Sequence, residues 1–221
     1  MYHYIRVNPN PHDKVGADLS VPPDRFAIEM QLLMQNGYHT ISVADLVAAV
    51  LDGAPLPQRP IVLTFDDGYE DFYTAAYPVL KRYGLNATSF IITGVVGQHG
   101  YLTWDQMREM QASGLVQFES HTVHHVLLDR VPLAKAQREL VNSKAALQEE
   151  LGRPVDVICF PSGKYNSAVL ALLHEDGYVA GVSTRQGAAH NAADLDALHR
   201  VRIHGRDTLS DFALRVGLGK H

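Results

Sequence analysis

The residues best suited to chemistry begin with two adjacent aspartates at the end of a short apolar run. Residues 61–65 predict a buried strand, and Asp66, Asp67 and Gly68 follow it directly. Two neighbouring carboxylates repel each other unless a cation or a proton lies between them, so the pair is costly without a function. An aspartate here would also suit the N-cap of the next helix, and the pair alone leaves both interpretations open.

A second strand-like segment, residues 116–120, ends in a group of histidines. His121 and His125 stand four residues apart, so one helical turn would bring both imidazoles to one face, as in other histidine pairs that bind zinc. His124 is expected to point elsewhere. Such a pair also occurs as satisfied or exposed side chains, because two ligands do not make a metal site.

Together the two segments predict a metal centre. Two histidines and one carboxylate give three protein ligands and leave a fourth position for water, which is the composition of a catalytic zinc site. The second aspartate is then free to act as a base. Zn²⁺ suits these ligands best, although other divalent transition metals bind the same side chains.

A mainly parallel sheet must position these residues, because short apolar runs alternate with helical patterns along the chain. We expect strands at 2–7, 61–65, 89–93, 116–120, 157–160, 179–183 and 199–203. We expect helices at 24–36, 42–51, 73–83, 103–113, 133–151, 167–175 and 207–216. About seven such α/β units predict a closed or nearly closed barrel in a single domain, residues 1–221, with its active site at the C-terminal ends of the strands.

The composition excludes several classes of protein. Hydrophobic residues make up 46% and charged residues 19% of the 221 residues, which is typical of a globular protein. The formal net charge is −5 and no Lys/Arg-rich run occurs, so no nucleic-acid partner is expected. There is no apolar stretch of about 18 residues, so no membrane span is expected. No signal peptide is recognisable, and the abrupt strand-like start leaves open whether a targeting segment preceded it.

The sequence resembles the polysaccharide deacetylase family, also called carbohydrate esterase family four or the NodB-homology domain. The family's first motif, Thr-Phe-Asp-Asp-Gly, is present at residues 64–68, and its second, His-Ser/Thr-x-x-His, at residues 121–125. Segments 2–5, 37–46 and 84–90 look like surface-polysaccharide deacetylases of this family, so the resemblance covers nearly the whole chain. It implies a distorted (β/α) barrel, in agreement with the strand count.

The resemblance also implies roles for individual residues. By position it makes Asp66 the general base, and Asp67, His121 and His125 the metal ligands. The third motif, Arg-x-Pro-x-Gly, keeps only its proline and glycine at residues 159–163, so the arginine that steadies the base is absent. Ser162 replaces the usual tyrosine there. The family uses the backbone N–H of this residue as an oxyanion donor, and a backbone donor tolerates the change.

A substitute for the missing arginine is expected on the strand 199–203. Arg200 or Arg202 could make a charge-assisted bond to Asp66 and hold it ionised. We include Arg200 in the predicted site. Both arginines could equally be surface residues, because only one face of a strand points inward.

Other candidate residues are less clearly marked. The family's general acid is a histidine from a closing motif that is indistinct here. His204 is the preferred candidate because it follows a strand, and His199 is the alternative. His204 could equally be a solvent-facing histidine without a catalytic role. Trp104 and Tyr69 could line a sugar groove, although such aromatics are more often core packing. Cys159, the only cysteine, lies in an apolar run and is expected to act as a small hydrophobe rather than a nucleophile.

The function implied is removal of N-acetyl groups from an N-acetylglucosamine-containing polysaccharide, with release of acetate. An O-acetyl esterase acting on xylan, or a deacylase of small amides, would use the same metal site. A carbohydrate-binding module that has lost turnover is the non-enzymatic alternative, to which the altered third motif gives some weight. The resemblance further implies an extracytoplasmic site of action on a carbohydrate polymer.

Overall fold

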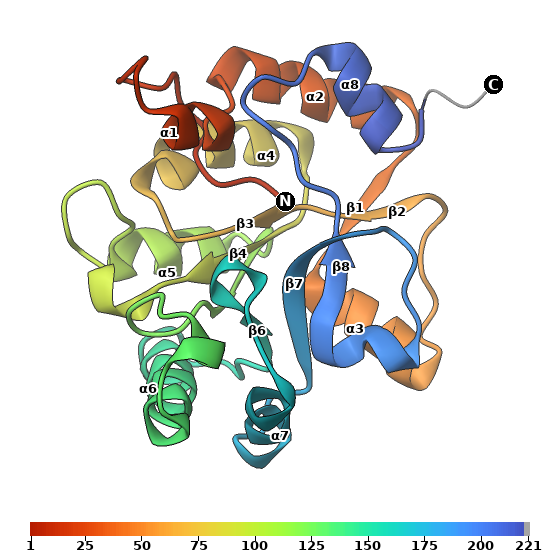
Figure 1. Cartoon of the computed structure of the whole chain (residues 1–221). Helices are drawn as coiled ribbons and strands as arrows, with labels where there is room; N and C mark the ends of the chain where they lie inside the picture. Colours follow the sequence, from red (N-terminus) through yellow and green to blue (C-terminus); the bar gives the residue numbers. More distant parts are fainter. Residues whose placement is uncertain (219–221) are drawn as a thin grey trace.

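A curled parallel sheet forms the centre of the protein, as seen in a computed structural model in which residues 1–218 are described (Figure 1). Its six strands have the order β3-β4-β5-β6-β7-β8. They are β3 (Thr64–Phe65), β4 (Ala87–Ile91), β5 (Val116–Ser120), β6 (Val157–Cys159), β7 (Ala180–Gln186) and β8 (Leu198–Arg200). The sheet forms a half-barrel with helices around it, which confirms the predicted distorted (β/α) barrel.

A separate two-stranded sheet lies beside the half-barrel. It consists of β1 (His39–Ile41) and β2 (Pro60–Val62), paired in parallel. The predicted strand 61–65 is therefore divided between two sheets, because the chain leaves β2 before Leu63 and enters β3 at Thr64. Strand β1 was not predicted, since three residues are too few to show an alternating pattern.

The predicted strand 2–7 is wrong. Tyr2 and Tyr4 make only isolated bridges, to Phe65 and Ser20 respectively, so the segment divides its pairing between two partners. The Tyr2 N–H donates to the carbonyl oxygen of Thr64 at 2.8 Å, and the Asp66 N–H donates to the carbonyl oxygen of Tyr2 at 3.0 Å. The start of the chain therefore runs directly beside the end of β3.

Helices surround the sheet (Figure 1). They are α1 (Lys14–Leu19), α2 (Pro23–Gln35), α3 (Val43–Asp52), α4 (Tyr77–Tyr83), α5 (Trp104–Ala112), α6 (Leu133–Leu151), α7 (Ser167–Glu175) and α8 (Leu209–Arg215). Short 3₁₀ turns lie at Thr93–Val95, Leu128–Arg130, Pro161–Gly163 and Ala192–Ala197. Helix α1 was not predicted, because six residues give too little helical periodicity. The predicted helix 73–83 begins with the π-helical turn Phe72–Ala76, because Pro78 lacks the N–H that a continuous α-helix requires.

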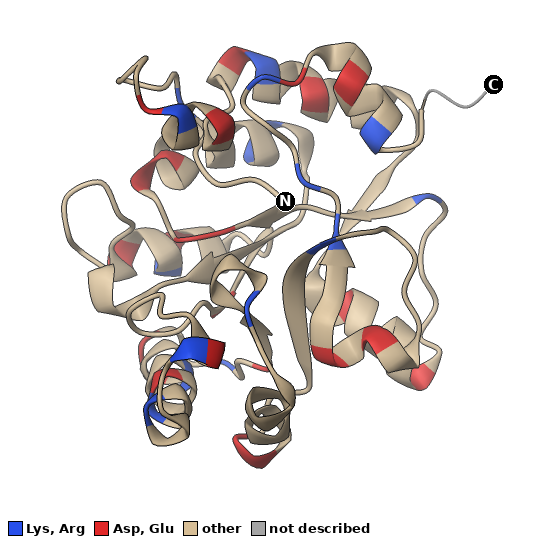
Figure 2. Ribbon diagram, in the orientation of Figure 1, with Lys and Arg blue, Asp and Glu red and all other residues tan. Residues whose placement is uncertain are grey.

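The main core cluster takes side chains from most of the elements, from Tyr2 to Phe212, with Phe26, Phe65 and Phe118 fully buried among them. Burying each such side chain contributes roughly 1.5–3 kcal/mol. Because one cluster joins side chains from most of the elements, we propose that the chain forms a single domain. Acidic and basic residues are interspersed over the outer helices (Figure 2). Within residues 1–218, no helix combines the length and the apolar character needed to cross a membrane.

Candidate active site

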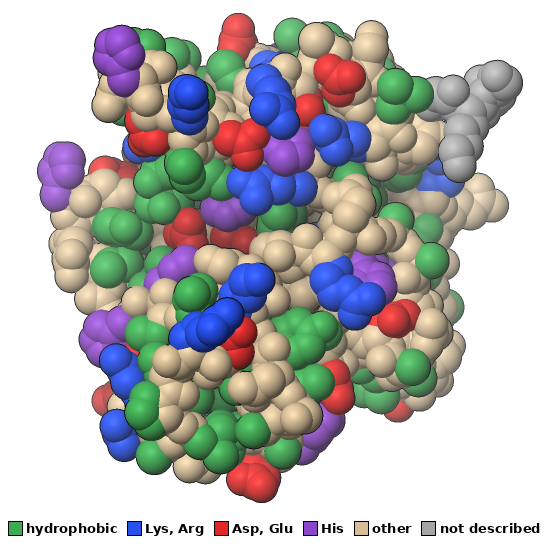
Figure 3. All heavy atoms as spheres, viewed as in Figure 1, with side chains coloured by type: hydrophobic (Ala, Val, Ile, Leu, Met, Phe, Trp, Pro, Cys, Tyr) green, Lys and Arg blue, Asp and Glu red, His purple; other side chains and the backbone are tan. Residues whose placement is uncertain are grey.

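Three strands bring the predicted site residues to one edge of the sheet. Asp66 and Asp67 follow β3, His121 follows β5, and Arg200 is the last residue of β8. Because these strands are parallel, their ends lie on the side of the barrel where active sites are found. Figure 3 shows acidic and histidine side chains gathered in a hollow on this face, where Figure 2 shows the acidic end of β3. Basic side chains stand around the hollow.

Asp67, His121 and His125 form a cluster whose distances would allow it to hold a metal ion. Oδ1 of Asp67 lies 3.2 Å from Nε2 of His121 and 3.6 Å from Nε2 of His125. The two imidazole rings are 4.8 Å apart between centroids. The structure therefore brings the three predicted ligands together.

Hydrogen bonding around this cluster favours a cation at its centre. Nδ1 of His121 donates to the carbonyl oxygen of Cys159 at 2.7 Å, which turns the lone pair of Nε2 toward Asp67. Among the described residues, no hydrogen-bond partner reaches the buried Oδ1 of Asp67. A lone pair and a carboxylate oxygen this close require a cation or a proton between them. Burial opposes a charged His121, but Cys159 and Asp67 raise its pKa well above the usual range, so the gap attracts positive charge.

The predicted helical turn between His121 and His125 is wrong. Residues 121–127 form a loop in which Thr122 (φ 67°) and His125 (φ 53°) adopt left-handed backbone conformations. Such residues cost about 1–3 kcal/mol each, so their surroundings must hold them. The Thr122 hydroxyl accepts the His125 N–H at 3.0 Å, which fixes the second histidine without a helix.

Glu139 of α6 holds this loop and was missed by the sequence analysis. Its Oε2 accepts the N–H groups of Val123 at 3.0 Å and His124 at 2.8 Å, and its Oε1 lies 2.9 Å from Nδ1 of His124. His124 is thus directed to Glu139 and away from the other two histidines, as predicted. The available signal was the core-facing position of Glu139, which shares the buried face of α6 with Ala136 and Ser143.

Arg200 holds the other aspartate, Asp66. Its Nη1 donates to Oδ1 at 2.6 Å and its Nη2 donates to Oδ2 at 2.8 Å. Arg202, the alternative candidate, pairs with Asp18 instead, at 3.1 Å. Both Asp66 and Arg200 are buried. Burial opposes ionisation of Asp66, but the charge and hydrogen bonds of Arg200 outweigh it and hold the pKa of Asp66 well below its usual range.

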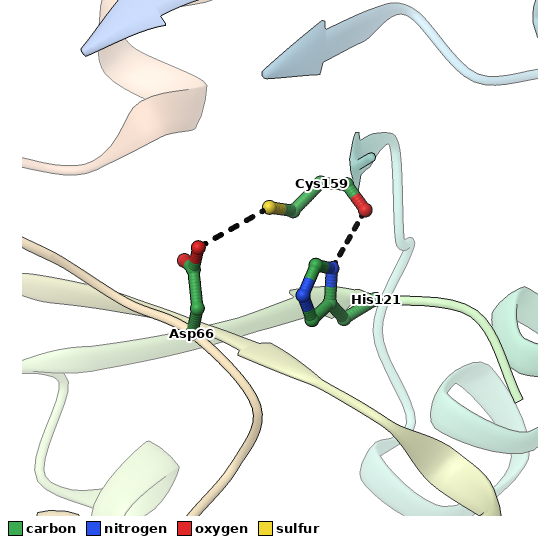
Figure 4. Close-up of side chains that lie close together, drawn as sticks. All are labelled: Asp66, His121 and Cys159. Carbon is green, nitrogen blue, oxygen red and sulfur yellow. Dashed lines mark hydrogen bonds between the residues drawn. The ribbon is translucent and has the colours of Figure 1, made fainter. Parts of the chain in front are cut away.

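Cys159 lies between Asp66 and His121 (Figure 4). Its thiol points at Oδ2 of Asp66, 3.6 Å away, and its sulfur accepts from Nη2 of Arg200 at 3.2 Å. Burial raises the pKa of the Cys159 thiol, which makes it a poor nucleophile. Asp66, His121 and Cys159 are also close enough to hold a metal ion. The Arg200 guanidinium already supplies positive charge there, so Asp67, His121 and His125 make the better site.

Backbone strain is concentrated at this edge of the sheet. Ser162, in the turn after β6, has φ 53°. Within residues 1–218, five non-glycine residues have positive φ, and four of them are Asp67, Thr122, His125 and Ser162. At Gly163, which has φ +66°, a Cβ would lie only 2.2 Å from Oγ1 of Thr184. Strained backbone of this kind typically clusters at functional sites.

His3 is a second residue that the sequence analysis missed. Its Nε2 lies 3.9 Å from Oδ2 of Asp66. Burial lowers the pKa of His3, although the carboxylates of Asp66 and Asp67 act in the opposite direction. The signal was a histidine inside a strand-like segment, but only the bridge between Tyr2 and Phe65 shows which strand it lies beside.

The two histidines predicted from the closing segment lie elsewhere. Nδ1 of His204 lies 3.0 Å from Oδ1 of Asp18. The ring of His199 is 6.3 Å from that of His190, and side chains alternate along β8, so His199 and Arg200 point to opposite faces. Among the contacts within residues 1–218, none joins either side chain to the two aspartates.

Comparison with known proteins places the chain in a family. Residues 53–181 match the sequence profile of the polysaccharide deacetylase family. The chain belongs to this family. It is 36% identical to the Bacillus subtilis protein YxkH over 203 residues, which cover 92% of the chain and 70% of that protein. This membership confirms the resemblance seen in the sequence and identifies the chain as a deacetylase of the carbohydrate esterase type.

Two further relatives of this deacetylase bear on its site. The structure of the Streptococcus pyogenes deacetylase PplD in complex with acetate matches with a TM-score of 0.90 at 34% identity, covering 98% of this chain and 96% of that one. The poly-beta-1,6-N-acetyl-D-glucosamine N-deacetylase of Escherichia coli (strain K12) is 29% identical over 240 residues. That match covers 90% of this deacetylase but only 36% of the E. coli protein.

The two aromatic residues predicted to line a sugar groove differ in their surroundings in this deacetylase. Trp104 packs against the main core cluster, which fits the core-packing alternative. Tyr69 stacks on Tyr4 instead, with ring centroids 3.6 Å apart. Burial raises the pKa of Tyr69, and the Asp67 carboxylate raises it further. Tyr69 also comes only two residues after Asp67 in the chain, so of the two aromatic residues it is the one beside the predicted ligands.

Proposed function

We propose that this polysaccharide deacetylase is a metal-dependent N-deacetylase acting on a polymer that contains N-acetylglucosamine. The cluster of Asp67, His121 and His125 carries the proposal, because a buried carboxylate oxygen with no hydrogen-bond partner among residues 1–218 faces two imidazole nitrogens there. Zinc is the proposed ion, since two histidines and one carboxylate suit it. A divalent ion at this place supplies a Lewis acid and lowers the pKa of water.

Asp66 is the proposed general base. Its bidentate pair with Arg200 keeps the carboxylate ionised and fixes its orientation. A base must be ionised before it can take a proton from water, and a fixed carboxylate beside the ligands meets that need. In this scheme Arg200 is a positioning residue, because it acts through Asp66.

The remaining roles concern the oxyanion and the leaving amine. The backbone N–H of Ser162, in the turn after β6, is the proposed oxyanion donor. We assign protonation of the departing amine to His3 rather than His204, because His3 lies 3.9 Å from Asp66 whereas His204 pairs with Asp18. A proton that Asp66 takes from water can therefore pass to His3 and on to the amine.

The proposed substrate class rests on the relatives. The E. coli relative is named for poly-beta-1,6-N-acetyl-D-glucosamine, and the S. pyogenes deacetylase was solved with acetate, the acid that deacetylation releases. We propose a β-1,6-linked N-acetylglucosamine polymer as the substrate of this chain. The family resemblance implies a surface polysaccharide as substrate, so the proposed place of action is extracytoplasmic.

Acetate release by metal-free and zinc-reconstituted protein tests the function. A β-1,6-linked N-acetylglucosamine pentamer is the main substrate, acetylated xylan is the competing one, and Asp67→Asn is the inactive control. Zinc-dependent release from the pentamer, abolished in the variant, supports the proposal. Release from xylan alone would point to an O-acetyl esterase. Zinc binding without release from either glycan would point to a binding module.

A further inference from the structure

Three tyrosines form a continuous stack beside the predicted metal ligands. The rings of Tyr4 and Tyr69 are stacked, with centroids 3.6 Å apart and an interplanar angle of 19°. The ring of Tyr101 follows at 5.2 Å from Tyr69, tilted by 32°. The guanidinium of Arg6 lies 3.3 Å from the Tyr4 centroid. Because Arg6 and Tyr69 are both so close to one ring, they must cover opposite faces of it, and the order is Arg6, Tyr4, Tyr69, Tyr101.

Backbone hydrogen bonds hold the Tyr101 end of this tyrosine stack. Tyr69 and Tyr101 form an antiparallel bridge. On either side of it, the Glu70 N–H donates to the carbonyl oxygen of Gly100 at 2.9 Å, and the Leu102 N–H donates to that of Gly68, also at 2.9 Å. The loop that carries Tyr101 is thus tied to the segment that carries the two aspartates. A preorganised surface binds a ligand with less loss of conformational entropy.

The other end of the stack is held independently. The Tyr4 N–H donates to the carbonyl oxygen of Leu19 at 3.2 Å, and the Val21 N–H donates to that of Tyr4 at 2.9 Å. Arg6 in turn donates from Nε to the hydroxyl of Ser20 at 3.4 Å. Three segments far apart in the sequence therefore converge on one column of rings.

Core packing does not account for this stack. Among the described residues, Tyr4, Tyr69 and Tyr101 are absent both from the two core clusters and from the partly buried residues packed against them. All three rings are half-buried, so each keeps some surface open to solvent. In Figure 3 hydrophobic side chains, a class that includes tyrosine, line the hollow on the side of α1 and α5. This is the side on which α1 follows Tyr4 and α5 follows Tyr101.

We propose that this tyrosine stack is a sugar-binding subsite, in which Tyr101 packs against the apolar face of a pyranose next to the unit being deacetylated. A pyranose presents C–H groups on its faces, and aromatic rings offer such faces a large rigid apolar contact. The Arg6 guanidinium covers the end of the stack at Tyr4, so a sugar extends the stack at its other end, on Tyr101. The subsite rests on the proposed function for its polymer, and it makes the protein favour an oligomer over a single sugar.

Direct binding of the β-1,6-linked N-acetylglucosamine pentamer tests the subsite without turnover. Isothermal titration is done in the Asp66→Asn background, with Tyr101→Ala, Tyr101→Phe and the control Tyr73→Ala. Tyr73 is also half-buried, but its hydroxyl bonds Glu109 of α5 at 2.7 Å. We expect Tyr101→Ala to weaken pentamer binding about tenfold, as the loss of one stacking contact of about 1.4 kcal/mol would. Tyr101→Phe, which keeps the ring, should restore most of the affinity, and Tyr73→Ala should bind as the parent does.

Kinetics separate failure of the subsite from failure of the proposed function. In active protein, Tyr101→Ala should raise KM for the pentamer more than it lowers kcat. Its kcat/KM should fall more for the pentamer than for 4-nitrophenyl acetate. Equal losses on both substrates, or unchanged pentamer affinity, overturn the subsite while deacetylation stands. Pentamer binding that depends on Tyr101 in a protein that releases no acetate overturns the proposed function and leaves the subsite. A parent protein that does not bind the pentamer at millimolar concentration overturns the subsite as well.

Discussion

Replacing Arg200 with methionine separates its electrostatic action on Asp66 from its bulk. Methionine keeps an unbranched apolar side chain but removes both hydrogen bonds to Asp66 and the bond from Nε to the carbonyl oxygen of Ser183 at 3.0 Å. Asp66 would then be a buried carboxylate without its partner. The matched control is Arg202→Met, because Arg202 pairs with Asp18 in a half-exposed position.

The size of the effect follows from the burial of the pair. Removing one partner of a buried ion pair costs roughly 3–5 kcal/mol, which corresponds to about two to four pK units on the remaining group. The pKa of Asp66 is now held well below its usual range by Arg200 against the effect of burial. Without Arg200, burial acts unopposed, so the pKa rises and the base is protonated over a wider range of acidic pH.

The sign of the stability change is also fixed. A carboxylate whose pKa is depressed in the folded state adds stability above its unfolded pKa of about 3.9 and loses it as the pH falls through the folded pKa. Arg200→Met should therefore lose roughly 3–5 kcal/mol of unfolding free energy at pH 7. The loss should shrink at pH 3, where protonation of Asp66 in the variant removes the uncompensated charge.

Carbon-13 NMR of aspartate-labelled protein gives the Asp66 titration directly, and urea unfolding at pH 7 and pH 3 gives the free energies. An Asp66 titration in Arg200→Met within one pH unit of the parent would refute the reasoning. So would an equal shift in Arg202→Met, because that change would then act through net charge rather than through the pair.

Three further changes test the roles of other residues. His3→Gln should lower kcat by about 10²–10⁴-fold, as loss of a general acid does, whereas His204→Gln should have little effect; the reverse order in a steady-state assay would restore the sequence prediction. Glu139→Gln should weaken zinc binding by about 10–100-fold, because it loosens the histidine loop. A competitive chelator titration measures this, with Glu149→Gln, an exposed position on the same helix, as the control. Asp67→Asn should abolish the stabilisation by zinc, which is about 2.7 kcal/mol at a zinc concentration of 100 times Kd. An undiminished zinc-induced rise in Tm would exclude Asp67 as a ligand.

The residues at the centre of the site could be identified from the sequence because their signal is local. Asp66 and Asp67 follow an apolar run directly, and His121 follows another. Parallel strands place such positions together whatever the loops between them do. The barrel could be predicted for the same reason, since it depends on the alternation of strands and helices rather than on any single contact.

What the sequence analysis missed depends on contacts between distant segments. His3 reaches Asp66 only because the N-terminal segment divides its bridges between Phe65 and Ser20. The spacing of His121 and His125 suggested a helical turn, but a left-handed backbone at Thr122 gives the same approach of the two rings. A spacing of four residues therefore predicted the contact correctly and the conformation wrongly.

The third motif lacks its arginine, but the site keeps a guanidinium beside Asp66 because Arg200 supplies one from another strand. Cys159 occupies the first position of that motif, and its sulfur lies 3.2 Å from the guanidinium of Arg200, which comes from β8. An arginine side chain at position 159 would compete for this buried space. The small Cys159 side chain therefore leaves room for the guanidinium of Arg200. Since β6 and β8 end at the same edge, either strand can deliver a guanidinium to Asp66. A missing motif residue is therefore weak evidence against activity when a neighbouring strand can place the same group at the same carboxylate.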